Sequence, residues 1–460
     1  MKAMTLEDYL RQDAQRYPAK TAVICGAQSL TYAELWRQVQ QSSMSLCHND
    51  QAASPNSSPV HCFRSSQSLA FLVTYLATHL SGRVAVPLEK DIPESRYQDI
   101  CRRLQSCDIP DGIADILFTT GTTGQSKGVM ISHRTIVADA ENLIEGQGFS
   151  HDLTFVVHGP LNHIGSLSKI YPVILLGATL HILDGLRDAD AFFRAFEPEG
   201  RYATFFVPAN IRYLLSFDAH RFAALADRLD FIESGGAPLA HADMRQLCQL
   251  LPRTRLYNTY ASTETGIIAT YNYNLNTESP APAREEDGGG GCGPAGCLGR
   301  PMRHSRILIT PQGLIACQGD TLMSGYVGDP ELTATVLRDQ TVYMSDYGSL
   351  DAEGRLLIGG RENDVINVGG YKVAPTEVED AALAIPGIKD CICIAAPHPI
   401  MGRALKLLVV MADGAAFSKR TIARTLAATL EPYKVPLLYE QVSAVARTYN
   451  GKLDRKHYCD

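Results

Sequence analysis

The sequence lacks the features that mark several large classes of protein. Its formal net charge is -7, with 42 Lys and Arg against 49 Asp and Glu, so it offers no basic surface for nucleic acid or an anionic membrane. It has no run of about 18 apolar residues and no amino-terminal signal pattern. We therefore expect a cytoplasmic protein with no membrane span, whose partner is a small molecule.

The twelve cysteines lack the spacing of a zinc site. Neither Cys391 and Cys393 nor Cys292 and Cys297 form a CxxC pair. Scattered cysteines of this kind indicate reduced thiols in a reducing compartment. The chain is long, with 460 residues, of which 45% are hydrophobic and 20% are charged. A chain of this length and composition can bury a large core and is expected to form two or more domains.

Residues 114–132, ADILFTTGTTGQSKGVMIS, combine two apolar strand patterns with a turn rich in hydroxyl groups and glycine. Hydroxyl donors, closely approaching backbone N–H groups and one lysine together suit a polyphosphate. The candidate phosphate ligands are Thr119, Thr120, Gly121, Thr122, Thr123, Gly124 and Lys127. A Walker A loop is unlike this segment, because Lys127 follows Ser126 and no helix pattern comes after it. A surface hairpin without a ligand is the alternative.

The stretch TTGTTGQSKG resembles the signature loop of the adenylate-forming superfamily, which includes acyl-CoA synthetases, peptide-synthetase adenylation domains and beetle luciferases. Other segments resemble further motifs of that family, in the family's order. They are LTYAEL at 30–35, GRVAVPL at 82–88, SGGAPL at 234–239, NTYASTETG at 258–266 and NGKLDR at 450–455. Residues 88–118 leave less room than the family uses, so we expect a trimmed first subdomain.

Helical and apolar strand patterns alternate between residues 133 and 234, which predicts a layered α/β fold with mostly parallel strands. Short strands between 306 and 358 predict a small β-rich region. We expect residues 1–361 to form a large N-terminal domain and residues 362–460 a small, mobile α+β domain. The Gly/Pro-rich residues 277–297 are predicted to be a mobile loop.

The resemblance implies a nucleotide site. Glu264 would hold Mg²⁺, for which a carboxylate at a strand end is also chemically suited, and Thr263 would touch the α-phosphate. The resemblance places the remaining nucleotide contacts at Gly235, Gly236, Ala237, Pro238, Asn258, Tyr260, Asp346 and Arg361. In this scheme Tyr260 lies against adenine, and Asp346 and Arg361 contact the ribose. An Asp in a simple β-turn is the alternative for Asp346.

The same resemblance implies that Lys452 bridges the acid and the α-phosphate. An Asn-Gly turn would present this lysine at a tip, although a solvated surface lysine is the alternative. Asn363 falls on the family's hinge, about which the small domain rotates between the two half-reactions. The side facing the thiol would then hold Gly369, Gly370 and Tyr371.

The acid pocket is implied by the segment PLNHIGS. His163 would border the acyl carboxylate, with a buried core histidine as the alternative, and the pocket lining would include Gly165, Lys169, Ser234 and Ala261. Ala261 stands where acetate-specific relatives carry Trp, so we expect an acid larger than acetate, aryl or medium-chain. Gly165 and Lys169 share one helix face, so Lys169 would pair with a second polar group of the acid unless it extends to solvent.

These residues predict an ATP-dependent carboxylic acid–CoA ligase that acts through an acyl-AMP and uses ATP, Mg²⁺ and coenzyme A. Coenzyme A is favoured because GGYKVAPTEVE at 369–379 resembles acyl-CoA ligases and no carrier domain follows. The main alternative is a standalone enzyme that loads the acid onto a carrier protein. A nucleotide-binding sensor without turnover is disfavoured, because every charge that the chemistry needs is present.

Overall fold

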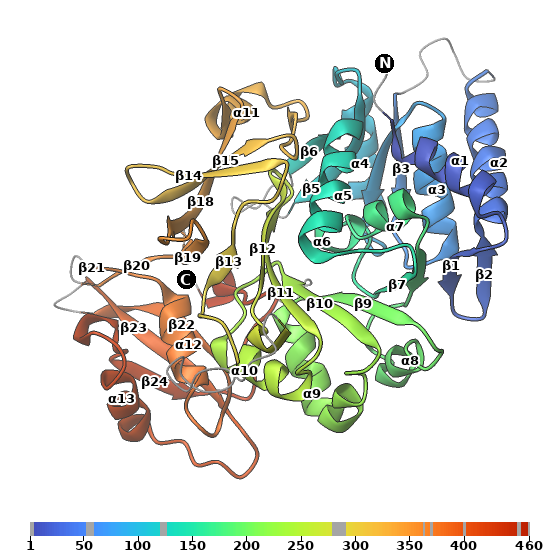
Figure 1. Ribbon diagram of the computed structural model, residues 1–460. Coiled ribbons are helices and arrows are strands. Elements are labelled where there is room, and N and C mark those ends of the chain that lie inside the picture. Colours follow the sequence, from blue (N-terminus) through green and yellow to red (C-terminus); the bar gives the residue numbers. More distant parts are fainter. Residues whose placement is uncertain are drawn as a thin grey trace.

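The computed structural model describes residues 4–51, 59–119, 127–277, 291–361, 364–368, 371–398, 402–448 and 452–458. Figure 1 shows a large unit, coloured blue to yellow, beside a smaller carboxyl-terminal unit in orange and red. Among the described residues, no helix is both long enough and apolar enough to span a lipid bilayer.

The largest sheet has eight strands. They are β1 Thr21–Cys25, β2 Gln28–Thr31, β7 Leu153–Val157, β8 Thr179–Ile182, β9 Arg201–Phe206, β10 Leu229–Gly235, β11 Arg255–Ser262 and β12 Gly266–Asn272. The spatial order is β12-β11-β10-β9-β7-β8-β1-β2, parallel from β11 to β1 and antiparallel at both edges. The carboxyl ends of the parallel strands therefore meet at one edge, where ligands of such sheets bind.

A second sheet carries the predicted phosphate loop. Its strands, in spatial order, are β16 Gly325–Tyr326, β6 Lys127–Ser132, β5 Ile113–Thr119, β4 Val84–Leu88 and β3 Val60–Arg64. Strands β3, β4 and β5 are parallel, while β5, β6 and β16 pair antiparallel. The predicted layered α/β architecture with mostly parallel strands is confirmed, while the trimming of this subdomain stays a prediction.

Helices cover these sheets (Figure 1). They are α1 Leu6–Arg16, α2 Tyr32–Gln51, α3 Leu69–Leu80, α4 Glu94–Gln105, α5 His133–Gln147, α6 Ile164–Leu167, α7 Ile170–Leu176, α8 Ala189–Arg194, α9 Pro208–Ala223 and α10 His241–Leu250. Local sequence sets several ends: the Ser68 hydroxyl accepts a hydrogen bond from the Phe71 N–H at 3.2 Å and caps α3. The single helix on which Gly165 and Lys169 were expected to share a face is instead split into α6 and α7, with Ser168 and Lys169 between them.

The β-rich region comprises β13 Cys297–Gly299, β14 Ser305–Ile309, β15 Leu314–Gly319, β17 Leu337–Arg338, β18 Thr341–Leu350 and β19 Leu356–Arg361, with the short helix α11 Pro330–Val336. Residues 278–290 of the predicted mobile loop lie outside the described residues. Residues 291–297 differ from that expectation, because the Leu275 N–H donates to the Gly291 carbonyl at 2.8 Å and Cys292 forms a β-bridge with Asn274. Backbone pairing orders this flank despite its Gly/Pro composition.

The carboxyl-terminal unit has its own hydrophobic core. Its elements are β20 Ile366–Val368, β21 Tyr371–Val373, α12 Pro375–Leu383, β22 Ile388–His398, β23 Gly402–Met411, α13 Lys419–Ala427 and β24 Leu438–Gln441. An ion pair joins the two units: Arg212 on α9, which also lies 2.7 Å from Asp243 on α10 of its own unit, lies 3.6 Å from Asp390 on β22. A domain boundary at residue 361 stays a prediction.

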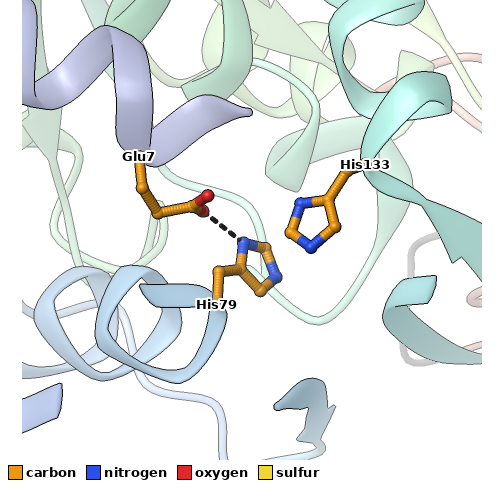
Figure 2. A group of neighbouring side chains, drawn as sticks. All are labelled: Glu7, His79 and His133. Atoms are coloured by element: carbon orange, nitrogen blue, oxygen red, sulfur yellow. Dashed lines mark hydrogen bonds and ion pairs between the residues drawn. The ribbon is translucent and has the colours of Figure 1, made fainter. Parts of the chain in front are cut away.

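A buried charged cluster fastens α1 to the core of the large unit. His79 on α3 lies between two carboxylates, with Nδ1 2.9 Å from Glu7 Oε1 and Nε2 2.8 Å from Asp115 Oδ1. Burial alone would lower the pKa of His79, but Asp115 and Glu7 outweigh it and raise that pKa to about 10. Figure 2 shows Glu7, His79 and the neighbouring His133. Because carboxylates already occupy both ring nitrogens of His79, we interpret the cluster as an ion-pair network rather than a metal site.

Candidate active site

Lys452 lies among residues from distant parts of the chain. Burial lowers the pKa of the Lys452 ammonium and Arg361 lowers it further, whereas Asp346 and Glu264 raise it. A Cβ placed on Gly236 would lie 3.9 Å from Lys452 Cε. Lys452 is therefore brought to the carboxyl end of β10 and is partly buried there, while its role in bridging the acid and the α-phosphate stays a prediction.

Two contacts hold this part of the carboxyl-terminal unit. The Thr448 N–H donates to the Lys452 carbonyl at 2.8 Å, and the Arg455 guanidinium contacts both oxygens of Glu379 on α12 at 2.6 and 2.8 Å. Asn450 and Gly451, which we expected to form the turn, lie outside the described residues. The bidentate contact fixes the segment that follows Lys452 on a helix of its own unit.

Asp346 is positioned from both sides by residues of the predicted nucleotide site. The Tyr260 hydroxyl donates to Asp346 Oδ2 at 2.8 Å, and Arg361 Nε donates to Oδ1 at 3.0 Å. Asp346 and Arg361 are register partners on β18 and β19, so the β-turn alternative is wrong. With 3% of its surface exposed, this carboxylate is a preorganised acceptor.

Glu264 and Lys127 are linked through Tyr326, a residue that we did not anticipate. The Tyr326 hydroxyl donates to Glu264 Oε1 at 3.0 Å, and Lys127 Nζ lies 5.4 Å from the centre of the Tyr326 ring. Thr119 and Lys127 are register partners at the ends of β5 and β6. The predicted ligands between them, Thr120, Gly121, Thr122, Thr123 and Gly124, lie outside the described residues. Tyr326 joins the site by pairing of β16 with β6, which no local pattern indicates.

The turn that carries Thr263 and Glu264 is fixed from behind. The Ile267 N–H donates to Asp139 Oδ1 at 2.8 Å, and the Met323 N–H donates to the Glu264 carbonyl at 2.9 Å. Gly266 has φ +67°, and a Cβ there would lie 2.5 Å from Asp139 Oδ1, so glycine is required. Both Thr263 and Glu264 remain partly exposed.

The predicted acid side is organised around Phe205, which was also not anticipated. A Cβ on Gly165 would lie 3.1 Å from Phe205 Cε1, and one on Gly235 would lie 3.5 Å from Cε2. Lys169 Nζ lies 5.2 Å from the centre of the same ring. Gly165 and Lys169 thus face the same ring, as the sequence predicted, even though the helix is broken between them.

Lys169 is fully buried and paired with Glu233 on β10. Its Nζ lies 2.8 Å from the Glu233 carboxylate, and the two side chains are 0% and 1% exposed. The alternative that Lys169 extends to solvent is wrong. Its partner belongs to the protein, so the pairing no longer requires a second anionic group on the acid. The sequence signal was a carboxylate that directly follows the apolar residues Phe231 and Ile232, because a buried charge needs a partner.

Ser234 is a correction to the predicted acid pocket. Its hydroxyl donates to the Tyr257 carbonyl at 2.9 Å. Ser234 alternates with Glu233 along β10, so its side chain points to the opposite face of the sheet from Lys169. Ala261 packs against the main core and remains partly exposed.

His163 precedes α6 and lies near Lys452. Burial and the Lys452 charge lower the pKa of His163 to about 4, so its imidazole is neutral at neutral pH. Its Nε2 is buried and has no hydrogen-bond partner within the described part of the chain. An unsatisfied nitrogen beside Lys452 supports the predicted contact with the acid over a satisfied core histidine.

The remaining predicted residues lie on β11, just after β10, in the carboxyl-terminal unit or outside the described part of the chain. The Asn258 amide donates to the Cys297 carbonyl at 3.2 Å, while Ala237 and Pro238 follow the end of β10. Tyr371 is exposed and stacks on Tyr433 with ring centres 4.5 Å apart. Asn363, Gly369 and Gly370 lie outside the described residues, so the hinge and the thiol side stay predictions.

Curated relatives extend over most of this chain. A feruloyl-CoA synthase from Amycolatopsis sp is 27% identical over an alignment of 482 residues that covers 96% of this chain and 95% of the relative. A 2-succinylbenzoate–CoA ligase from Staphylococcus aureus strain JH9 is 28% identical over 354 residues, which covers 75% of this chain and 66% of the relative.

Solved structures share the fold. ATP-bound MatB from Rhodopseudomonas palustris superposes with a TM-score of 0.82 at 21% identity over 99% of both chains. The anthranilate CoA ligase AuaEII with anthranoyl-AMP gives 0.83 at 17% identity, covering 99% of this chain and 96% of that one. The AMP-binding enzyme profile matches residues 10–109 and 103–327, and the profile of the AMP-binding enzyme C-terminal domain matches 377–452. The chain belongs to the family of AMP-binding enzymes.

Proposed function

We propose that this protein is an ATP-dependent carboxylic acid–CoA ligase that forms an acyl-AMP before it forms the thioester. The observation that carries the proposal is the placement of Lys452 beside Gly236 at the end of β10, within electrostatic reach of Asp346, Arg361 and Glu264. Relatives named as CoA synthase and CoA ligase, which match 96% and 75% of the chain, support the same reaction. The acid is larger than acetate, since Ala261 leaves the pocket open.

The first half-reaction is an electrostatic problem. A carboxylate attacks the α-phosphorus of ATP and pyrophosphate leaves, so one anion must approach another. Lys452 between the reactants and Lys127 beside the departing phosphates oppose the charge that grows in the transition state. One such donor contributes roughly 2.7–4 kcal/mol to lowering the barrier. Neutral His163 donates or accepts a hydrogen bond beside the acid without adding charge.

Glu264 fits the role of a magnesium ligand. It is a partly exposed carboxylate just after the end of β11. Its Oε1 accepts a hydrogen bond from the Tyr326 hydroxyl, and no bond to its Oε2 is found within the described residues. Mg²⁺ commonly takes one or two protein carboxylates and completes its coordination with phosphate oxygens and water. When bound, the ion would neutralise phosphate charge in addition to the two lysines.

The second half-reaction needs Lys452 to leave the site. The thiol must approach the acyl carbonyl carbon, and Lys452 would block that approach. Rotation of the carboxyl-terminal unit about Asn363 would remove it and bring Gly369, Gly370 and Tyr371 to the thiol. Rotation would also break the ion pair of Arg212 with Asp390, whose charged atoms lie 3.6 Å apart. Both side chains are partly exposed, so breaking this pair costs little free energy.

The test is a pyrophosphate-release screen of ATP with aryl, fatty and dicarboxylic acids, followed by mass spectrometry of the product with coenzyme A. We expect pyrophosphate release and an acyl-CoA. Release without an acyl-CoA, together with acylation of an added carrier protein, would favour the carrier-loading alternative. Nucleotide binding without release for any acid would contradict the ligase and favour a sensor.

Replacing Glu264 with Gln should weaken binding of Mg·ATP by about 100-fold while changing binding of a non-hydrolysable acyl-AMP analogue far less. The analogue lacks the two phosphates that share the metal, so loss of the carboxylate charge affects it little. Isothermal titration calorimetry measures both ligands, with the exposed Glu331→Gln as the matched control. Equal losses for the two ligands would place the metal elsewhere.

A further inference from the structure

The Lys169–Glu233 pair lies buried beside the Phe205 ring, which faces Gly165 and Gly235 of the proposed acid pocket. Glu233 and Gly235 are two residues apart on β10, so they share one face of the strand, about 7 Å apart along it. Gly235 faces the Phe205 ring, and the next residue, Gly236, approaches Lys452. The acid's reacting carboxylate belongs at the Lys452 end, so Glu233 lies deeper, toward the distal end of the acid.

The two charges of the pair cancel. Lys169 Nζ lies 2.8 Å from Glu233, and neither side chain has appreciable contact with solvent. Asp139 also acts on Lys169, but burial raises the pKa of Asp139 to about 8, so it is mostly protonated at neutral pH. The Phe205 ring, whose centre lies 5.2 Å from Lys169 Nζ, carries no charge. The deep part of the pocket is therefore electrically neutral although it contains a lysine.

A second carboxylate on the acid would meet no excess positive charge there. It would have to displace Glu233 from Lys169 or lie buried beside an anion, and both carry a large electrostatic cost. An uncharged aryl or alkyl end would only have to pack against Phe205, with the neutral pair buried beside it. Discrimination of this kind comes from a repulsive element, which here is Glu233.

We propose that Glu233 is a specificity-determining residue that neutralises Lys169 and so makes the pocket select monocarboxylic acids with an uncharged distal end over dicarboxylic acids. The inference rests on the proposed function, because it requires that this pocket receives the acid. A purely structural ion pair would instead affect all acids alike.

The first test needs only the wild-type chain. Each acid is compared with its nitro isostere: terephthalate with 4-nitrobenzoate, and 4-carboxycinnamate with 4-nitrocinnamate, in the pyrophosphate-release assay. We expect kcat/KM for the nitro acids to be about 100-fold higher or more, since the charge is the main difference. Comparable or better use of the dicarboxylic acids would overturn the inference while leaving the ligase function intact.

The second test moves the charge. Glu233→Gln keeps the size of the side chain but leaves Lys169 uncompensated, so the nitro-to-carboxy ratio of kcat/KM should fall by about tenfold or more. The double variant Lys169→Met/Glu233→Gln removes both charges and should restore discrimination against the dicarboxylic acids. An unchanged ratio in soluble Glu233→Gln would assign the pair a structural role. If that variant does not fold, the wild-type comparison still decides, whereas no release with any acid contradicts the proposed function itself.

Discussion

We expect Lys452→Ala to slow adenylate formation by about two to three orders of magnitude but to leave thioester formation from added acyl-AMP largely intact. In the proposed first half-reaction the ammonium, which lies within electrostatic reach of Glu264, Asp346 and Arg361, would oppose the charge of two approaching anions. Loss of a single preorganised donor of this kind costs about 10²–10³-fold in rate. In the second half-reaction the lysine must be absent from the site, so its removal should matter little.

Single-turnover assays of the two half-reactions measure this difference. Lys406→Ala is the matched control, because Lys406 lies on β23 in the same unit and pairs at 2.6 Å with Glu440. That control should change neither rate appreciably. Equal losses in both half-reactions of Lys452→Ala would show that the carboxyl-terminal unit does not exchange positions between them.

His79→Gln should lower the free energy of unfolding by about 3–5 kcal/mol, the largest stability change that we expect from one substitution. Glutamine cannot supply the charge that compensates Glu7 and Asp115, both of which are buried. Urea unfolding and Tm measure the effect. His61→Gln is the control, because His61 bonds only the Thr78 hydroxyl in the described residues, at 2.8 Å. A similar small loss for both variants would mean that the cluster contributes no more than an ordinary hydrogen bond.

The stability difference should also depend on pH. The pKa of His79 is raised from 6.5 to about 10 in the folded chain, so its contribution is complete below pH 6.5 and is lost as the pH rises through 10. Burial raises the pKa of Glu7, but His79 outweighs this and lowers it below 4.5, so that contribution is lost as the pH falls. The gap between wild type and His79→Gln should therefore be widest near pH 5–6.5 and shrink toward pH 10.

Much of the fold follows from local sequence. The apolar runs between 133 and 234 became the parallel strands β7 to β10, and the Ser68 cap marks the start of α3. Contiguous motifs also identified the nucleotide side of the candidate site, because Asp346, Arg361 and Glu264 meet Lys452. Such short segments carry their own turns and strand ends, so their side chains need little further information to be placed.

The partners of these residues were not predictable in the same way. Tyr326 reaches Glu264 only because β16 pairs with β6, and Phe205 meets Gly165 and Gly235 only because β9 lies beside β10. The helix break at Ser168–Lys169 and the ordered flank at 291–297 likewise depend on packing with distant segments. Pairings between segments far apart in sequence leave no periodic signal in either one.

The sequence by itself determined the family and the layered α/β sheets, and it predicted the residues of the nucleotide side, including Lys452. Only the tertiary structure decided the partner of Lys169 and the side of β10 on which the neighbouring Ser234 lies. The physical reason is that successive strand residues point to opposite faces, so a shift of one residue in register would exchange Glu233 and Ser234. Register is fixed by the packing of the whole sheet, and the charge balance of the acid pocket depends on it.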